Sequence, residues 1–298
     1  MTINDLLQKG GEILKHDSQT PDLDSEILLS FVLERDRAYL YTHREEPVKE
    51  KLKQKYYSLL ERRKNGEPIA YITNTKEFYS LDFYVDKNVL IPRPETEDLV
   101  DLAFEEIQRL VKNVKSRAGS VRIVDVGTGS GCIGVTLIHK IIESGLNGKT
   151  GFDFYLIDIS GKVLNVAKKN YIKLISDVKN VKVNFVKTDL LKGFKNKFDI
   201  IASNPPYIPS GKIDFLDRAV KDFEPRVALN GGRGGLVTIK RLINEAVKRL
   251  MPEGRFLFEL LEEHPETVKL YLEENFPKYK VEFKKDSFGE WRFAVVSR

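Results

Sequence analysis

The sequence predicts an α/β fold: a mainly parallel sheet with helices on both faces, preceded by a small helical domain. From residue 121 onward, short and almost continuously apolar runs alternate with helical stretches, which is typical of parallel strands buried on both faces. Before residue 76, apolar residues recur at helical spacing and β-branched runs are few. The length of 298 residues also suits one large domain and a small one.

Composition narrows the class of protein. Hydrophobic residues make up 41% and charged residues 31% of the chain, which excludes disordered and collagen-like proteins. The N-terminus lacks a basic region followed by an apolar one, and no uncharged apolar run approaches the roughly 18 residues of a membrane span, so we expect a cytoplasmic protein. The single cysteine, Cys132, excludes an internal disulfide, and the histidines lack metal-ligand spacing, so we expect no metal.

Residues 1–75 are predicted to form the helical domain. Their helix-spaced apolar residues fall into three groups: Leu6, Leu7, Ile13 and Leu14; Leu23, Ile27, Leu28, Phe31 and Val32; and Tyr56, Leu59 and Leu60. Pro21 and Asp22 mark a helix start. With 12 basic and 13 acidic side chains the domain is almost neutral, which argues against an arm that binds nucleic acid.

Residues 76–95 are predicted to form a β-hairpin linker between the two domains. The segment 77–92 is aromatic and β-branched, and the polar residues Asp86, Lys87 and Asn88 predict its turn. Residues 96–298 form the second domain. Its strands are predicted at 121–127, 152–159, 181–189, 198–204 and 255–260, followed by a closing antiparallel hairpin of 281–286 and 291–298.

A glycine-rich loop follows the first predicted strand of the sheet and opens a helix, the place where doubly wound sheets bind nucleotides. Its residues are Asp125, Gly127, Thr128, Gly129, Ser130 and Gly131. The G-x-G-x-G spacing differs from that of dinucleotide-binding folds, and no Lys-Ser/Thr pair follows as in a P-loop, so phosphate binding is disfavoured. The acid at the start of the loop suits a cationic cofactor that carries an amino or sulfonium group. We expect Cys132 to pack beside this loop as a small apolar residue.

Acidic residues also end the next two strands. Asp158 ends the second strand, where a carboxylate accepts both hydroxyls of an adenosine ribose. Asp189 and Leu190 end the third, near the position expected for an adenine. Each acid alone is equally explained as a strand-end or helix-capping residue. Because three strand ends meet at one crevice of the sheet, a shared cofactor site is the favoured interpretation.

The tetrapeptide Asn204, Pro205, Pro206 and Tyr207 directly follows the fourth strand. Two prolines cannot continue a central strand, so it forms a rigid loop at the same sheet edge. A planar amide nitrogen is a poor nucleophile because its lone pair is delocalised. Fixed acceptors, the Asn204 oxygen and the Pro205 carbonyl, can each take an N–H of the target and aim its lone pair at a methyl donor. Tyr207 offers an aromatic wall for a planar group.

These motifs resemble those of the HemK/PrmC family of protein-(glutamine) methyltransferases, from about residue 20 to the end. The matching segments are 68–71, 77–81, 90–97, 125–131, 204–207 and 224–225. The resemblance implies a Rossmann-like class I S-adenosylmethionine-dependent methyltransferase sheet of seven strands and a helical N-terminal domain that docks the substrate. It implies S-adenosyl-L-methionine as cofactor and S-adenosyl-L-homocysteine as product. The implied substrate is the glutamine of the GGQ motif in peptide chain release factors, and we expect a monomeric enzyme.

The resemblance also assigns residues. It implies cofactor contacts from Gly127 to Gly131 and at Asp158 and Asn204, with the substrate glutamine held by the tetrapeptide. Arg93 and Glu95 are expected to close over the site, or else to brace the linker by ion pairing, and Glu224 is expected to shape the substrate side. One departure concerns 259–264: the family often has E-I-G-x-x-Q there, and the lost glycine puts the conformation of that loop in doubt.

Three other functions stay open at this point. The first is a methyltransferase that acts on a ribosomal-protein glutamine, and the second is a DNA or RNA amino-methyltransferase, which the nearly neutral N-terminal domain disfavours. The third is a protein that binds the cofactor or RNA without chemistry. Residues 162–197 hold ten lysines against the acids Asp177 and Asp189, which predicts either a solvated surface or docking to an acidic or RNA-containing partner.

Overall fold

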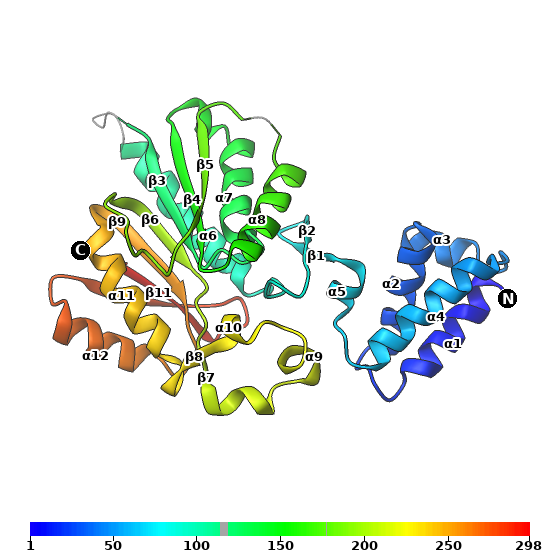
Figure 1. The fold of residues 1–298 in the computed structure, drawn as a ribbon. Helices are drawn as coiled ribbons and strands as arrows, with labels where there is room; N and C mark the ends of the chain where they lie inside the picture. The colour runs from blue at the N-terminus through cyan, green and yellow to red at the C-terminus, as the bar shows by residue number, and fades with distance from the viewer. Residues whose placement is uncertain (114–118, 177) are drawn as a thin grey trace. The chain divides into compact units, whose positions relative to one another are not determined.

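The computed structural model of this protein describes residues 1–113, 119–176 and 178–298 (Figure 1). Asp177 of the lysine-rich segment therefore lies outside the described residues. The chain divides into two compact units. The first comprises 1–75 with 216–223, and the second comprises 76–215 with 224–298. Within the described residues, no helix is both long and apolar enough to cross a lipid bilayer.

The first unit is helical, as predicted. It contains α1 (Ile3–Leu14), α2 (Pro21–Leu33), α3 (Arg37–Thr42), α4 (Glu50–Lys64), α5 (Ile69–Thr73) and α9 (Arg218–Lys221). Pro21 occupies the first turn of α2, where its missing N–H costs nothing. The core holds predicted residues from all three groups, including Leu6, Leu28 and Leu60. Two predicted members, Leu23 and Phe31, are instead 38% exposed.

The linker hairpin has its turn at a different place from the one predicted. Strands β1 (Thr75–Phe78) and β2 (Leu81–Tyr84) form a two-stranded sheet. Tyr79 and Ser80 connect them, with φ of 54° and 57°, the left-handed conformation that a two-residue hairpin turn needs. The predicted turn at Asp86–Asn88 exists but follows β2: the Asn88 N–H donates to Asp86 Oδ1 over 2.9 Å. The prediction of the hairpin turn was wrong because Tyr-Ser is not a typical turn sequence.

The second unit contains the predicted sheet. Its strands are β3 (Val121–Val126), β4 (Phe152–Asp158), β5 (Val181–Lys187), β6 (Phe198–Ser203), β9 (Leu250–Glu259), β10 (Lys280–Lys285) and β11 (Trp291–Ser297). Their order is β10-β11-β9-β6-β3-β4-β5. The five strands from β9 to β5 are parallel to their neighbours, whereas β11 runs antiparallel to β9 and β10. The five predicted parallel strands and the closing hairpin are thereby confirmed.

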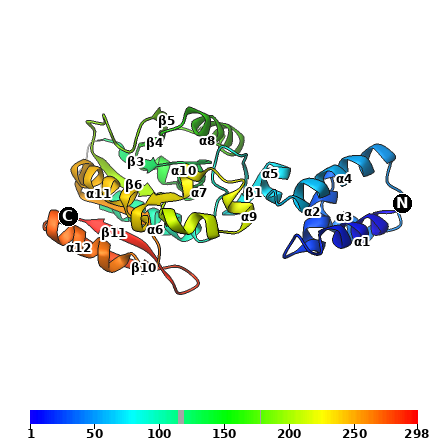
Figure 2. The same ribbon diagram turned by 60° about the horizontal axis from the view of Figure 1, so that its bottom comes forward.

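Helices cover both faces of this sheet (Figures 1 and 2). The helices on one face are α6 (Thr96–Asn113), α7 (Cys132–Glu143) and α8 (Gly161–Leu174), and those on the other are α11 (Val237–Arg249) and α12 (Pro265–Asn275). Adjacent residues of β3 enter different cores: Ile123 packs in the α6–α7 core and Val124 in the α11–α12 core. Burial on both faces explains why the strands read as continuous apolar runs.

Short elements connect β6 to α11 near the carboxyl ends of the parallel strands. They are β7 (Ile208–Pro209), η3 (Ser210–Phe215), α10 (Arg226–Leu229), β8 (Asn230–Gly232) and η4 (Arg233–Gly235). A further 3-10 turn, η2 (Leu146–Gly148), follows α7. Strands β7 and β8 pair in parallel. This pairing holds the segment after the tetrapeptide against the segment that precedes α11.

All ten lysines of 162–197 are exposed. They lie on α8, on β5 and in the loops before and after β5. Two of them contact the linker segment: Lys173 Nζ donates to the Asp82 carbonyl over 2.7 Å, and Lys169 lies over the Tyr84 ring. Because β5 is the last strand in the sheet order, its lysines also keep an unpaired strand edge charged, which opposes edge-to-edge association.

Candidate active site

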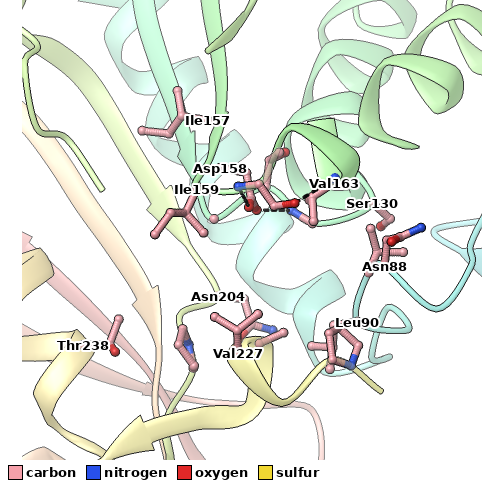
Figure 3. Close-up of a pocket in the computed structure, with 18 of the residues that line it drawn as sticks. Asn88, Leu90, Ser130, Ile157, Asp158, Ile159, Val163, Asn204, Val227 and Thr238 are labelled. Carbon is pink, nitrogen blue, oxygen red and sulfur yellow. Dashed lines mark hydrogen bonds between the residues drawn. The ribbon is translucent and has the colours of Figure 1, made fainter. Parts of the chain in front are cut away.

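A cavity of about 380 Å³ lies at the carboxyl ends of the parallel strands. This volume falls in the range of small-molecule binding sites. Figure 3 shows Asp158 and Ile159 on one side of the cavity and Asn204, Leu90 and Val227 on the opposite side. Asp158, predicted to bind the cofactor, and Asn204, predicted to act on the substrate, therefore share one space.

The glycine loop faces this cavity. Gly127 and Gly129 have φ of 69° and 57°, a conformation that other residues rarely adopt. A Cβ built on Gly127 would meet no atom within 4 Å, so the space in front of the loop is open for a ligand. Gly131 differs, because a Cβ there would lie 3.2 Å from Val135. Gly131 therefore permits close packing of the loop against α7, and it does not line the cavity.

Asp125 supports the loop from behind. Its side chain is fully buried, and Oδ2 accepts hydrogen bonds from Thr128 Oγ1 at 2.6 Å and from the Gly134 N–H at 3.0 Å. Oδ1 has no hydrogen-bond partner among the described residues. Burial raises the pKa of Asp125 to about 6. The structure places this carboxylate outside the cavity wall, which differs from the direct cofactor contact expected from the sequence.

Asp158 does line the cavity. It ends β4, where Oδ1 accepts from the Ser160 N–H at 3.0 Å and Oδ2 lies 3.4 Å from the Gly129 N–H. Burial raises its pKa, and the backbone hydrogen bonds of Ser160 and Gly129 oppose that rise. The carboxylate thus holds the glycine loop at the strand end and keeps oxygen lone pairs available to a ligand hydroxyl.

Asp189 and Leu190 line the same cavity. Leu190 has a positive φ of 51°, and Asp189 forms an ion pair of 2.6 Å with Arg241 of α11. Arg241 and Thr238 also line the cavity, although no sequence motif predicted either residue there. Their position depends on how α11 packs next to the loop after β5, for which the local sequence carries no signal. Cys132 also lines the cavity beside the glycine loop, and burial raises the pKa of its thiol to about 12.

The tetrapeptide after β6 is only partly in the cavity wall. Asn204 and Pro206 line the cavity, whereas Pro205 and Tyr207 do not. Asn204 Nδ2 donates to Thr96 Oγ1 at 3.1 Å, and the Tyr207 hydroxyl donates to Glu259 Oε1 at 2.7 Å. Burial raises the pKa of Tyr207 well above its usual value. The structure therefore shows Tyr207 holding the loop through its hydroxyl, and the aromatic wall expected from the sequence is not part of the cavity lining.

Of the expected lid residues, Arg93 lines the cavity and Glu95 does not. Arg93 Nη2 pairs with Glu224 Oε1 at 2.6 Å, and Glu224 Oε2 accepts from the Ile91 N–H at 3.1 Å. Burial raises the pKa of Glu224, while the charge of Arg93 opposes the rise. Arg93 thus makes the bracing ion pair that was one of the two predicted alternatives.

Thr96 and Glu259 contact the tetrapeptide, although no sequence motif predicted a role for either residue. Thr96 Oγ1 donates to Glu259 Oε2 over 2.8 Å, and both residues are 1% exposed. Thr96 lies in the motif 90–97, so the sequence predicted that this segment matters but did not predict what Thr96 does. Glu259 lies at the end of β9, where only the packing of α6 against the sheet shows what it touches.

The loop after Glu259 keeps an ordinary backbone without the missing glycine. No residue of 259–264 has a positive φ. The His264 ring holds the loop: Nε2 lies 3.0 Å from the Gly234 carbonyl, and Nδ1 lies 3.4 Å from the Leu261 N–H. Burial lowers the pKa of His264. The departure from the family pattern is thus accommodated in a loop that does not need glycine.

Comparisons with known proteins give the family. Residues 5–73 match the model described as the PrmC N-terminal domain, and residues 118–289 match a methyltransferase domain. A release factor glutamine methyltransferase from Koribacter versatilis is 39% identical, over 86% of this chain and 86% of the relative. One from Leptospira interrogans is 36% identical, over 98% of this chain and 97% of the relative.

The chain belongs to the release factor glutamine methyltransferase family. Membership in this family makes the protein a methyltransferase, and it agrees with the resemblance found in the motifs. A solved structure titled ribosomal protein L11 methylase, from Lactobacillus delbrueckii subsp. bulgaricus, aligns with a TM-score of 0.44 at 19% identity, over 72% of this chain and 83% of that one. That similarity is too low to bear on the substrate. Within the described residues, no group of three or more His, Cys, Asp or Glu side chains is arranged to hold a metal.

Proposed function

We propose that this protein transfers the methyl group of S-adenosyl-L-methionine to the side-chain amide nitrogen of the glutamine in the GGQ motif of peptide chain release factors. The observation that supports this most is the position of Asn204. Its side chain shares the cavity with Asp158 and the glycine loop, and its Oδ1 has no hydrogen-bond partner among the described residues. Family membership supports the same reaction.

The residues present fit the cofactor. The open space in front of Gly127 allows a ligand to approach the backbone closely, and Asp158 offers oxygens for ribose hydroxyls. We place the adenine near Leu190 and Asp189. The cofactor supplies an electrophilic methyl group, and S-adenosyl-L-homocysteine is the product.

The residues of the chain act on the substrate amide. Asn204 Oδ1 and the Pro205 carbonyl each accept one N–H of the glutamine, so the nitrogen lone pair is directed to the methyl carbon and the charge that develops on nitrogen is stabilised. The two prolines restrict the backbone that carries this carbonyl. Tyr207 fixes the end of the loop by donating to Glu259. The glutamine proton leaves to solvent after the transfer.

The remaining assignments concern partners and place. We assign substrate docking to residues 1–75 and substrate shaping to Arg93, Glu95 and Glu224. We assign the linker role to 76–95 and catalysis to 96–298. We expect a monomer that works in the cytoplasm, where release factors act, and no nucleic acid as substrate, because the first 75 residues are nearly neutral.

The first experiment is methyl transfer from labelled S-adenosylmethionine to four acceptors in parallel. They are purified release factor, its variant with alanine in place of the GGQ glutamine, ribosomal protein, and duplex DNA. We expect label on the release factor and none on its variant. Label on ribosomal protein or DNA instead would overturn the substrate while keeping the reaction class. Asn204→Ala serves as the inactive enzyme control.

A further inference from the structure

A chain of hydrogen bonds joins the two ends of the tetrapeptide inside the protein. Asn204 Nδ2 donates to Thr96 Oγ1 at 3.1 Å, and Thr96 Oγ1 donates to Glu259 Oε2 at 2.8 Å. The Tyr207 hydroxyl donates to the other oxygen, Oε1, at 2.7 Å. Thr96 begins α6 and Glu259 ends β9, so three separate segments meet at this carboxylate.

The direction of these hydrogen bonds follows from the chemistry of the groups. A carboxylate can only accept, whereas a hydroxyl has one hydrogen to give. Both hydroxyls, of Thr96 and Tyr207, are committed as donors to Glu259. The Thr96 oxygen can therefore only accept from a third group, and that group is the Asn204 side chain.

This direction matters because the two ends of an asparagine amide are nearly identical in shape. Steric packing alone cannot distinguish the orientation with Oδ1 toward the substrate from the flipped one. The flipped orientation would set Oδ1 of Asn204 against an oxygen of Thr96 that has no hydrogen left to give. Only in the observed orientation does Nδ2 donate to Thr96 Oγ1 while Oδ1 stays available to accept from the substrate.

The surroundings of Glu259 suit it to accept hydrogen bonds from both hydroxyls. Its side chain is 1% exposed, so water does not compete for the two oxygens. Burial raises the pKa of Glu259, and the hydrogen bonds from the Tyr207 and Thr96 hydroxyls and the charge of Arg292 oppose that rise. A buried network of this kind is specific only when every member is paired, and each of the two carboxylate oxygens has a donor here.

We propose that Thr96 and Glu259 are positioning residues for methyl transfer, which fix the rotation of the Asn204 amide so that its oxygen, and not its nitrogen, meets the substrate N–H. The proposal deepens the proposed function and rests on it. Thr96 lines the cavity and Glu259 does not. Because the Thr96 hydroxyl is occupied by Glu259 and by Asn204, we assign both residues an action through Asn204.

The test compares Thr96→Val, which removes the hydroxyl at nearly constant shape, with the matched variant Thr96→Ser, which keeps it. We expect Thr96→Val to lower kcat about tenfold, a typical coupling between neighbouring groups, with the cofactor Kd and the KM for release factor little changed. Thr96→Ser should recover most of the lost turnover. Thermal unfolding of each variant checks the fold, and Thr96→Ala replaces Thr96→Val if the valine variant is unstable.

A double-mutant cycle separates positioning from a merely structural role. Because Thr96 acts through Asn204, Thr96→Val should cause no further loss of turnover in an Asn204→Ala background. An equal loss in both backgrounds, or a Thr96→Ser enzyme as slow as Thr96→Val, would overturn the inference. So would full turnover in Thr96→Val alongside an active wild type. A wild type that labels no release factor would instead overturn the proposed function itself.

Discussion

Arg93 and Glu224 form an ion pair with Nη2 and Oε1 2.6 Å apart, although 131 residues separate them in the chain. The Glu224 side chain is 1% exposed and that of Arg93 is 31% exposed. Glu224 also accepts from the Ile91 N–H. The pair therefore ties the segment before α6 to the segment before α10, and both segments line the cavity.

Removal of Arg93 should destabilise the protein, because it leaves the Glu224 carboxylate buried without its charge partner. We expect Arg93→Ala to lower the free energy of unfolding by about 2 kcal/mol, somewhat less than for a fully buried pair, because Arg93 is partly exposed. Urea unfolding monitored by circular dichroism measures it. The control is Lys212→Ala, which breaks an exposed pair with Glu263 and should cost less than about 0.5 kcal/mol. An equal loss of unfolding free energy in both variants would contradict a stabilising role for the Arg93–Glu224 ion pair.

Asp125 should make stability depend on pH. Burial raises its pKa to about 6 in the folded protein, above the value of about 3.9 in an unfolded chain. The unfolded state therefore loses its proton first as pH rises, so stability from this group falls between about pH 4 and pH 6 and then levels off, by up to about 3 kcal/mol.

Asp125→Asn should remove the fall in stability that occurs as pH rises. An asparagine oxygen can accept from Thr128 and Gly134 as Oδ2 does, and its NH₂ group would replace Oδ1, which has no hydrogen-bond partner among the described residues. Urea unfolding at pH 4.5 and pH 7 compares the two proteins. A wild type and variant with the same change in unfolding free energy between these pH values would show that Asp125 is not the titrating group.

Asn204→Ala should lower turnover by roughly 10²- to 10³-fold while cofactor binding stays intact, since the lost oxygen acts on charge that develops during the reaction. Labelled methyl transfer measures turnover, and calorimetry measures cofactor binding. Asn165→Ala, at an exposed position of α8, is the matched control and should turn over normally. Unchanged turnover in Asn204→Ala with normal cofactor binding would rule out the catalytic assignment.

Asp158→Ala should weaken cofactor binding by roughly 10- to 100-fold, because hydrogen bonds to a charged group contribute about 1.5–3 kcal/mol. Calorimetric titration with S-adenosyl-L-homocysteine gives the Kd without turnover. Asp153→Ala is the control: Asp153 lies on the same strand, β4, but near its start and outside the cavity wall. A Kd that changes equally in both variants would argue against a direct contact at Asp158.

Much of the site was predictable because its signals are local. The glycine loop is recognisable in the sequence because its glycines permit the positive φ that the loop needs. The tetrapeptide is recognisable because its two prolines end a buried strand. The roles of Asp125 and Tyr207 were not predictable in the same way. Both were expected to face a ligand, and both instead brace loops from behind, at Thr128 and Glu259 respectively. A motif identifies the residue type at a position but not the side to which its polar atoms turn.

The sequence by itself determined the order of helices and strands, the sheet with two covered faces and the place of the glycine-rich loop, since apolar periodicity and backbone restrictions act within a few residues. Only the tertiary structure decided that Thr96 lies between Asn204 and Glu259, and that Arg241 reaches Asp189. Thr96 and Glu259 are 163 residues apart, and they meet because α6 packs against β9. Such contacts depend on the path of the whole chain, because a hydrogen bond reaches only about 3 Å.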